Sequence, residues 1–222
     1  MNFPYIVKEF AKRIAFRNRF LGWLSRPRYG YNLKPGQLAA LVDALDKTRH
    51  LSGAVVEIGV ARGMTTIFLK RHMKETDDMR RFICVDTFSG FIREDVAYER
   101  EQRGKDQPEL GGFAYNDPAV FRRNMGALGL DRIDIIQKDC GLLTKEDLGS
   151  VSLALLDVDL YLPTKRAIGT VYDALQSGGI MMVDDVTDGT AFDGAAAAYF
   201  EFCKERRIDP CVIANKGGML KK

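Results

Sequence analysis

Short apolar runs alternate with longer amphipathic stretches along the chain from residue 54 onward. Runs such as Leu153–Leu156 and Ile180–Val183 are apolar at every position, which is typical of strands covered on both faces of a parallel sheet. The runs predict strands over Ala54–Val60, Arg81–Asp86, Ile133–Asp139, Leu153–Asp159 and Gly179–Asp185.

The amphipathic stretches between these runs predict helices. Pro163 suits the first turn of a helix, and Ser177-Gly178-Gly179 is a signal for a helix to end. Strands alternating with helices indicate a doubly wound α/β domain, with a mostly parallel sheet and right-handed crossovers. Residues 209–222 predict a closing hairpin around Asn215–Gly218. The helices are expected over Met64–Glu75, Pro118–Gly129, Pro163–Gln176 and Phe192–Arg207.

Two segments fall outside this alternation, and they divide the chain into an arm (residues 1–33) and a domain (residues 34–222). Residues 91–117 form a long, charged connection within the domain. We interpret them as a lid over the substrate, because long connections in compact domains are usually functional or disordered. The alternative is a solvated insertion. The aromatic residues of this connection are Phe91, Tyr98, Phe113 and Tyr115.

The arm is predicted to be helical, basic and aromatic, with Glu9 as its single acid. Such a helix can lie on an anionic membrane, or it can pack on the domain or on the partner subunit of a homodimer. We favour packing, with Tyr29, Tyr31 and Leu33 closing over a cofactor. Its basic residues are Lys8, Lys12, Arg13, Arg17, Arg19, Arg26 and Arg28, and they are interleaved with Phe3, Phe10, Phe16, Phe20 and Trp23.

Composition excludes several classes of protein. The net charge of +3 gives no argument for a nucleic-acid partner. The cysteines form no C-x-x-C pair, which disfavours zinc and suits a reducing cytoplasm. No apolar run approaches the roughly 20 residues that span a bilayer, so no integral membrane association is expected, and no signal peptide is evident. His50 and His72, both expected on helices, are the only histidines, which disfavours a Ser-His-Asp triad.

The first predicted strand ends in a glycine-rich turn, Glu57–Gly63. Gly59 and Gly63 allow a tight turn and the close approach of a ligand. Ala61 stands where the dinucleotide fingerprint has its middle glycine, which disfavours NAD. A carboxylate at Glu57 suits a cofactor that carries an ammonium and a sulfonium group.

Acids also end the next two strands. Asp86 can accept hydrogen bonds from both ribose hydroxyls, and Asp139 from an exocyclic amine such as that of adenine. The alternative is that such acids only cap loops and helices. Their recurrence at strand after strand favours a cofactor site.

Taken in order, these motifs resemble those of class I S-adenosylmethionine methyltransferases, and within that class the macrocin O-methyltransferase family of sugar O-methyltransferases. The resemblance covers roughly residues 34–222, although Val158 stands where that family commonly has glycine. It rests on Glu57–Gly63, Asp86–Phe91, Leu156–Tyr161 with Thr164, Gly178–Asp185 and Gly217–Lys222.

The resemblance implies a seven-stranded, mostly parallel sheet with an antiparallel C-terminal strand, and S-adenosylmethionine as the cofactor. The residues expected to bind this cofactor are Glu57, Gly59, Val60, Ala61, Arg62, Gly63, Thr65, Asp86, Thr87, Phe88, Asp139, Cys140 and Asp157.

Further aspartates follow the fourth and fifth predicted strands, which should be neighbours. Carboxylates at Asp157, Asp184 and Asp185 would repel one another unless a cation or proton intervened. Oxygen ligands favour Mg²⁺, Ca²⁺ or Mn²⁺ over zinc, and the resemblance implies Mg²⁺. The alternative is that Asp184 and Asp185 bind only loop amides. Asp157 or Asp159 could take the proton of an attacking hydroxyl.

The sequence thus predicts a metal-dependent O-methyltransferase whose acceptor is a hydroxyl of a sugar or glycosylated product. A phenolic, catechol-like or other small acceptor is the nearest alternative. An NAD-binding oxidoreductase and a non-catalytic scaffold are the alternatives from other classes.

Overall fold

The computed structural model describes residues 3–18, 20 and 29–222. These residues belong to two compact units, one that extends to Asn32 and one that spans Leu33–Lys222. Four of the basic and aromatic residues that we assigned to the arm lie outside the described residues. They are Arg19, Trp23, Arg26 and Arg28.

The described part of the first unit contains one helix, α1 (Phe3–Arg17). The apolar side chains of Ile6, Phe10 and Ile14 are exposed on it. Within the helix, the Lys12 ammonium lies 2.6 Å from a Glu9 carboxylate oxygen. Across the described residues of the whole chain, no helix combines the length and the apolar character that crossing a membrane requires.

The second unit is built on a seven-stranded sheet in the order β3-β2-β1-β4-β5-β7-β6. The first five strands are parallel, and β7 joins β5 and β6 in antiparallel pairs. The predicted fold class, including the antiparallel C-terminal strand, is confirmed. The strands are β1 (Ala54–Ile58), β2 (Phe82–Asp86), β3 (Ile133–Gln137), β4 (Val151–Leu156), β5 (Leu175–Val183), β6 (Cys211–Ile213) and β7 (Gly217–Lys221).

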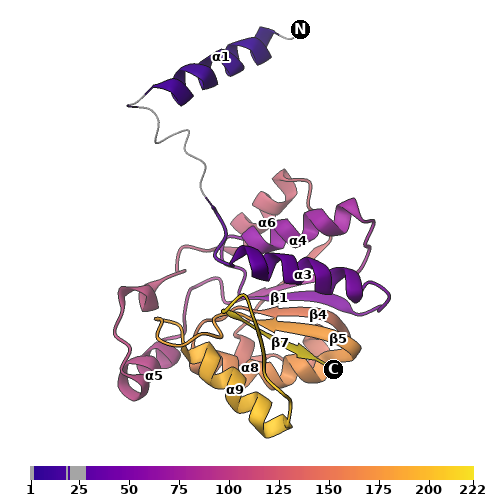
Figure 1. Cartoon of the computed structure of the whole chain (residues 1–222), viewed down its shortest axis with the longest axis vertical. Helices are drawn as coiled ribbons and strands as arrows, with labels where there is room; N and C mark the ends of the chain where they lie inside the picture. Colours follow the sequence, from indigo (N-terminus) through magenta and orange to yellow (C-terminus); the bar gives the residue numbers. More distant parts are fainter. Residues whose placement is uncertain (1–2, 19, 21–28) are drawn as a thin grey trace. The chain divides into compact units, whose positions relative to one another are not determined.

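Helices cover both faces of the sheet, with α3, α4 and α6 on one face and α8 and α9 on the other (Figure 1). The helix α5 contacts α8. The bounds are α3 (Pro35–Lys47), α4 (Met64–Glu75), α5 (Arg93–Arg103), α6 (Pro118–Ala127), α7 (Lys145–Leu148), α8 (Tyr161–Ala174) and α9 (Gly194–Arg206), with 3₁₀ turns at Pro108–Gly111 and Cys140–Leu142.

The core lies where both helical layers meet the central strands. Every residue of β1 and of β4 is buried, as the continuous apolar runs predict. The helix α8 adds Ala167, Ile168 and Val171 to the main apolar cluster. Burying an aliphatic side chain of this kind contributes about 1.5–3 kcal/mol, so the centre of the sheet is a rigid platform for the loops at its edge.

The boundaries of α8 and β5 differ from the prediction. The helix begins at Tyr161, two positions before Pro163, and ends at Ala174. Ser177-Gly178-Gly179 therefore lie inside β5 rather than stopping the helix. Pairing with β4 shifts across this segment, because Leu175 pairs with Val151 whereas Ile180 pairs with Leu153. The glycines accommodate this irregularity in the strand.

The prediction missed three helices, α3, α5 and the short α7, and placed His50 wrongly on a helix. His50 lies in the turn after α3, whereas His72 lies on α4 as expected. The bounds of α4 agree with the prediction at both ends.

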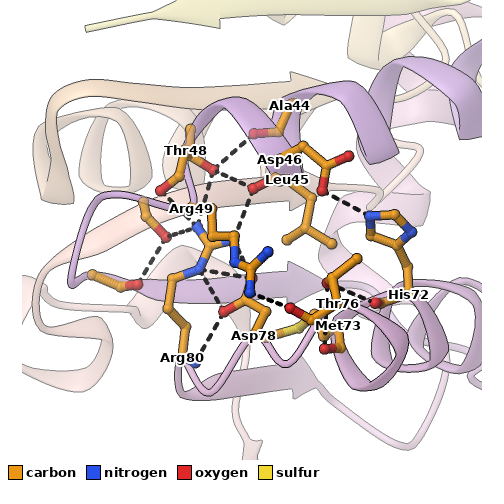
Figure 2. A network of polar contacts seen from close by, with 12 residues as sticks. Ala44, Leu45, Asp46, Thr48, Arg49, His72, Met73, Thr76, Asp78 and Arg80 are labelled. Atoms are coloured by element: carbon orange, nitrogen blue, oxygen red, sulfur yellow. Dashed lines mark hydrogen bonds and ion pairs between the residues drawn. The ribbon is translucent and has the colours of Figure 1, made fainter.

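A buried ion pair joins the ends of α3 and α4 to the sheet (Figure 2). The guanidinium of Arg80 pairs with the Asp78 carboxylate, and both side chains are almost fully buried. Arg80 also donates to the backbone oxygens of Leu45 and Thr48, near the C-terminal end of α3, at 2.8 and 2.9 Å. A third contact reaches Ser152 of β4, at 3.0 Å. Positive charge at a helix C-terminus is favourable, so Arg80 fixes α3 against the strands.

Candidate active site

The turn after β1 is pressed against the end of β4. Gly59 has a φ of +83°, and a Cβ atom at this position would lie only 1.8 Å from the backbone oxygen of Asp157. The Asp157 backbone N–H donates to the oxygen of Ile58 at 2.8 Å. Only glycine fits such a position. The turn and Asp157 therefore lie side by side, at the carboxyl ends of β1 and β4.

The same turn leads into α4 through two further residues with positive φ. Gly63 has a φ of +80°, and a Cβ atom there would lie 2.7 Å from the ring of Phe121. Ala61 has a φ of +43°, a conformation that costs a non-glycine residue roughly 1–2 kcal/mol. The amide of Asn116 donates to the Ala61 backbone oxygen at 2.5 Å. The turn is thus held to residues 91–117, a link that the sequence did not predict.

Asp86, the last residue of β2, holds this turn through backbone amides. One carboxylate oxygen accepts from the N–H groups of Val60 and Ala61 at 2.9 and 3.2 Å. The other accepts from Phe88 at 2.7 Å. The carboxylate therefore lies against the glycine-rich turn and shapes the loop, and its role toward a cofactor stays a prediction.

The other expected residues of these two loops differ in exposure. The Phe88 ring is buried and packs edge-on against Phe121, with 5.7 Å between ring centroids. Thr87 donates its hydroxyl hydrogen to the Gly90 backbone oxygen at 2.8 Å. Thr65 is buried in the first turn of α4, whereas Arg62 is exposed.

Glu57 lies beneath the turn rather than at its surface. Its side chain is buried, and one carboxylate oxygen accepts a hydrogen bond from the Thr66 hydroxyl at 2.6 Å. Burial raises the pKa of this carboxyl to about 8, despite the hydrogen bond from Thr66, which lowers it. The expected carboxylate is therefore present at the turn, but it faces α4.

Asp139 and Cys140 lie in the loop after β3. The backbone of Lys138 donates to the oxygen of Asp86 at 3.0 Å, which places this loop beside the end of β2. One Asp139 carboxylate oxygen accepts from the Gly141 backbone at 2.8 Å. The Cys140 thiol is buried, and burial raises its pKa to about 12. A thiol with so high a pKa is a packing group rather than a nucleophile.

Asp157, Asp184 and Asp185 converge as predicted. Each offers one carboxylate oxygen, and these oxygens lie within 4.8 Å of one another. They meet because β4 and β5 are adjacent, with the Asp184 backbone N–H donating to the Leu156 oxygen at 2.9 Å. Asp159 and Asp185 both have positive φ, of 62° and 58°. Such strained backbone at non-glycine residues is concentrated at functional sites. These four aspartates are called the acidic cluster below.

With every carboxyl ionised, the acidic cluster would carry more negative charge than the one lysine beside it balances. Burial raises the pKa values of Asp157, Asp159 and Asp185 above the usual aspartate range, and repulsion within the cluster raises them further. The Lys216 ammonium lies 2.7 Å from Asp184 and 3.0 Å from Asp185. Burial opposes the charge on Lys216, but the two aspartates outweigh it and raise its pKa.

This donor set fits a hard divalent cation. The ligands are carboxylate oxygens, and one lysine cannot neutralise four acids, so a second positive charge would be stabilised here. Mg²⁺ and Mn²⁺ match such ligands better than zinc does.

Lys216 and Gln37 are site residues that the sequence did not predict. Gln37, a buried residue of α3, donates to the second carboxylate oxygen of Asp184 at 2.6 Å. Both residues come from segments far from the aspartates in sequence. The one available signal was the predicted closing hairpin, whose turn carries Lys216.

Within residues 91–117, the first half is tied to the domain. Asp95 is buried and pairs with Arg166 of α8. Glu99 is also buried, and it accepts a hydrogen bond from the Tyr161 backbone N–H at 2.7 Å. Arg103 bridges Glu99 and Asp193, each at 2.9 Å. The helix α5 is thus anchored over the start of α8.

Aromatic rings join both ends of this connection to the loop after β5. The Phe91 ring lies 5.4 Å from that of Phe113 and 6.1 Å from that of Phe192, measured between centroids. Tyr98 stacks on Tyr161 at 5.5 Å. Tyr115 is exposed.

Comparison with known proteins identifies the family. The family model for macrocin O-methyltransferases matches residues 12–216. Among solved structures, the O-methyltransferase NovP is 17% identical, with a TM-score of 0.68 over 84% of this chain and 79% of its own. The calicheamicin methyltransferase CalS11 is also 17% identical, with a TM-score of 0.67 over 97% of this chain and 85% of its own. No curated protein sequence matches this chain.

Proposed function

The chain belongs to the macrocin O-methyltransferase family and is an S-adenosylmethionine-dependent methyltransferase, and from this premise we propose that it methylates a hydroxyl group of a sugar or glycosylated natural product with the help of a divalent metal ion. Family membership sets aside the NAD-binding oxidoreductase and the scaffold. A sugar acceptor is supported by CalS11, which is described as a TDP-rhamnose 3'-O-methyltransferase.

The observation that carries this proposal is the contact between the glycine-rich turn and the acidic cluster. Gly59 lies directly against the backbone of Asp157. A cofactor seated on the turn would therefore present its methyl group beside the carboxylates. Methyl transfer is an in-line displacement at the sulfonium carbon, so donor and acceptor must be held a few ångströms apart.

The cofactor would be held by the two loops that Asp86 joins. In this proposal the turn from Gly59 to Gly63 receives the methionine part, and Asp86 faces the ribose. Asp139 and Cys140 border the adenine. Glu57 would act from beneath the turn on the ammonium group, whose positive charge would lower the pKa of the buried carboxyl and favour its ionised form.

The acidic cluster would hold the metal ion and the acceptor hydroxyl. Asp157, Asp184 and Asp185 are the proposed ligands. A divalent ion makes a bound hydroxyl more acidic and orients it. Asp159, or Asp157 itself, would take the hydroxyl proton as the oxygen attacks the methyl carbon. A raised carboxyl pKa suits this role, because a base works best when its pKa lies near the working pH. The products are the methyl ether and S-adenosylhomocysteine.

The proposal also assigns a role to the domain, to residues 91–117 and to the arm. Residues 34–222 form the catalytic domain, and residues 91–117 cover the acceptor. The arm, residues 1–33, packs against a partner subunit in a homodimer. No nucleic acid takes part, and the free cysteines suit the cytoplasm.

Metal removal and substitution of the ligands test the proposal. Asp157→Ala and Asp185→Ala are expected to lower turnover at least about a hundredfold and to leave the fold intact, because each removes a carboxylate that binds the metal. Excess EDTA should have the same effect on the unaltered enzyme, and Mg²⁺ should reverse it. The measurement is formation of S-adenosylhomocysteine with a panel of nucleotide sugars, glycosylated products and phenols.

Asp173→Ala is the matched control, because it removes a partly exposed acid of α8 that pairs with Arg206. Full activity of the two ligand variants would contradict the metal site. Turnover of phenols alone would contradict the sugar acceptor.

A further inference from the structure

Lys216 is held on the acidic cluster by its backbone as well as by its side chain. Its backbone oxygen accepts from the Val186 N–H at 2.7 Å, and its own N–H donates to Ile213 at 3.0 Å. Val186 directly follows Asp185, so the hairpin turn is fastened to the segment that carries two of the aspartates. The Lys216 side chain is only 17% exposed. The ammonium group is therefore placed at the cluster by the fold.

The contacts of Lys216 use the oxygens that a metal ion would need. Asp184 gives one oxygen to Lys216 at 2.7 Å and the other to Gln37 at 2.6 Å. Asp185 gives one oxygen to Lys216 at 3.0 Å. Gln37 is itself fixed, because its side-chain oxygen accepts from the Lys34 N–H at 2.9 Å. A metal ion bound by Asp157, Asp184 and Asp185 would lie close to the Lys216 ammonium, which already contacts two of these carboxylates.

We propose that the Lys216 ammonium is the resident counter-cation of the acidic cluster, and that a divalent ion binds the aspartates in competition with it. This inference rests on the metal site of the proposed function. The lysine keeps the carboxylates assembled when no metal is bound, and it must withdraw from Asp185 and Asp184 when the metal enters. Its presence therefore lowers the affinity of the site for divalent ions.

A lysine that only strengthened the hairpin would behave differently. Replacing it would weaken the fold by the same amount whether or not metal was present. A competing cation has two linked effects. Its loss destabilises the metal-free protein, because buried carboxylates lose their partner. Its loss also strengthens metal binding, because the repulsion between two cations disappears.

The test is metal binding by the full-length protein, measured by calorimetry with Mn²⁺ alone. Lys216→Met removes the charge and keeps a side chain of similar length. We expect this variant to bind Mn²⁺ at least about tenfold more tightly, a modest part of what a neighbouring unit charge contributes at an effective dielectric constant of about 20. Its melting temperature without metal should fall, and the rise in melting temperature on adding Mn²⁺ should exceed that of the unaltered protein.

Two further variants keep the test decisive. Lys216→Gln removes the charge but retains a hydrogen-bond donor for Asp184, and it replaces the methionine variant should that one fail to fold. Lys222→Met is the matched control, since Lys222 lies just after β7 and donates to the Asp173 backbone oxygen instead of to the cluster. It should bind Mn²⁺ like the unaltered protein.

Equal or weaker Mn²⁺ binding by both Lys216 variants would overturn the inference while leaving the metal site in place. Absence of Mn²⁺ binding in every protein, with S-adenosylhomocysteine still bound, would overturn the metal site itself. Binding of S-adenosylhomocysteine is therefore measured on the same samples.

Discussion

At the scale of single residues, Glu57 affects stability and, in the proposed function, cofactor binding. Its carboxyl is buried under the glycine-rich turn, with a pKa of about 8 against an ordinary value of 4.5. The folded protein therefore retains a proton that the unfolded chain releases near pH 4.5. The stability contributed by this group is complete below pH 4.5 and declines as the pH rises through about 8.

Glu57→Gln should remove this decline. The amide can still accept the hydrogen bond from Thr66, but it carries no charge to bury. We expect the variant to gain about 4–5 kcal/mol at pH 8.5 relative to the unaltered protein, since each unit of the shift in pKa from 4.5 to about 8 corresponds to about 1.4 kcal/mol, and to show little difference at pH 4.5. Urea unfolding at both pH values measures this. A variant that is less stable at pH 8.5 would contradict the assigned burial of charge.

The same variant also tests the proposed role of Glu57 toward the cofactor. Loss of the carboxylate should weaken binding of S-adenosylmethionine, which calorimetry would detect. Unchanged affinity would show that Glu57 serves the fold alone. The two readouts are independent, because one concerns folding and the other binding.

At the scale of elements, α5 shows how a helix can be held by polar rather than apolar contacts. Its buried residues are Asp95 and Glu99, which pair with Arg166 and with the start of α8. A pattern of apolar positions at helical spacing could not reveal it, because its buried face consists of acids. The strands, by contrast, were predictable from their continuous apolar runs.

Glu99→Ala should loosen α5. The Tyr161 N–H would lose its buried partner, which costs about 1–3 kcal/mol, and Arg103 would lose one of its carboxylates. Hydrogen exchange should therefore quicken in α5 and in the first turn of α8. Glu101→Ala is the control, because that side chain is exposed on the same helix. Equal exchange in the two variants would contradict the anchoring role of Glu99.

At the scale of the whole molecule, the candidate site and the buried Arg80–Asp78 ion pair are separate. The turn and the acidic cluster follow the carboxyl ends of the strands, whereas Arg80 lies before β2 and binds the last residues of α3 (Figure 2). A substitution at this ion pair can therefore lower the stability of the fold without changing the candidate site.

Arg80→Met should lower the free energy of unfolding by about 3 kcal/mol, since it leaves the Asp78 carboxylate buried without its partner. Affinity for S-adenosylhomocysteine at low temperature should stay within about twofold, because no contact of Arg80 reaches the glycine-rich turn. Arg81→Met is the matched control. Its pair with Asp134 is about half exposed, and such pairs contribute about 0–1 kcal/mol. A similar loss in both variants would contradict this ranking.

Much of this architecture follows from sequence because it depends on order along the chain. Parallel strands end at one edge of a sheet, so acids after successive strands must gather there, as Asp86 and Asp157 do. Lys216 and Gln37 were missed for the opposite reason. They reach Asp184 through the closing hairpin and through α3, and no local pattern records contacts between segments so distant in sequence.

The place of β7 in the sheet has a consequence for synthesis. This strand follows β6 along the chain, yet it lies between β5 and β6 in the sheet. Residues 175–183 therefore emerge from the ribosome with one edge uncovered, and Asp184 and Asp185 emerge without Lys216. The part of the sheet that carries the proposed active site cannot be completed until residues 217–221 have been translated. Before that point a nascent chain would have an unpaired edge on β5 and no lysine beside Asp184 and Asp185, so the proposed metal site would lack its resident cation.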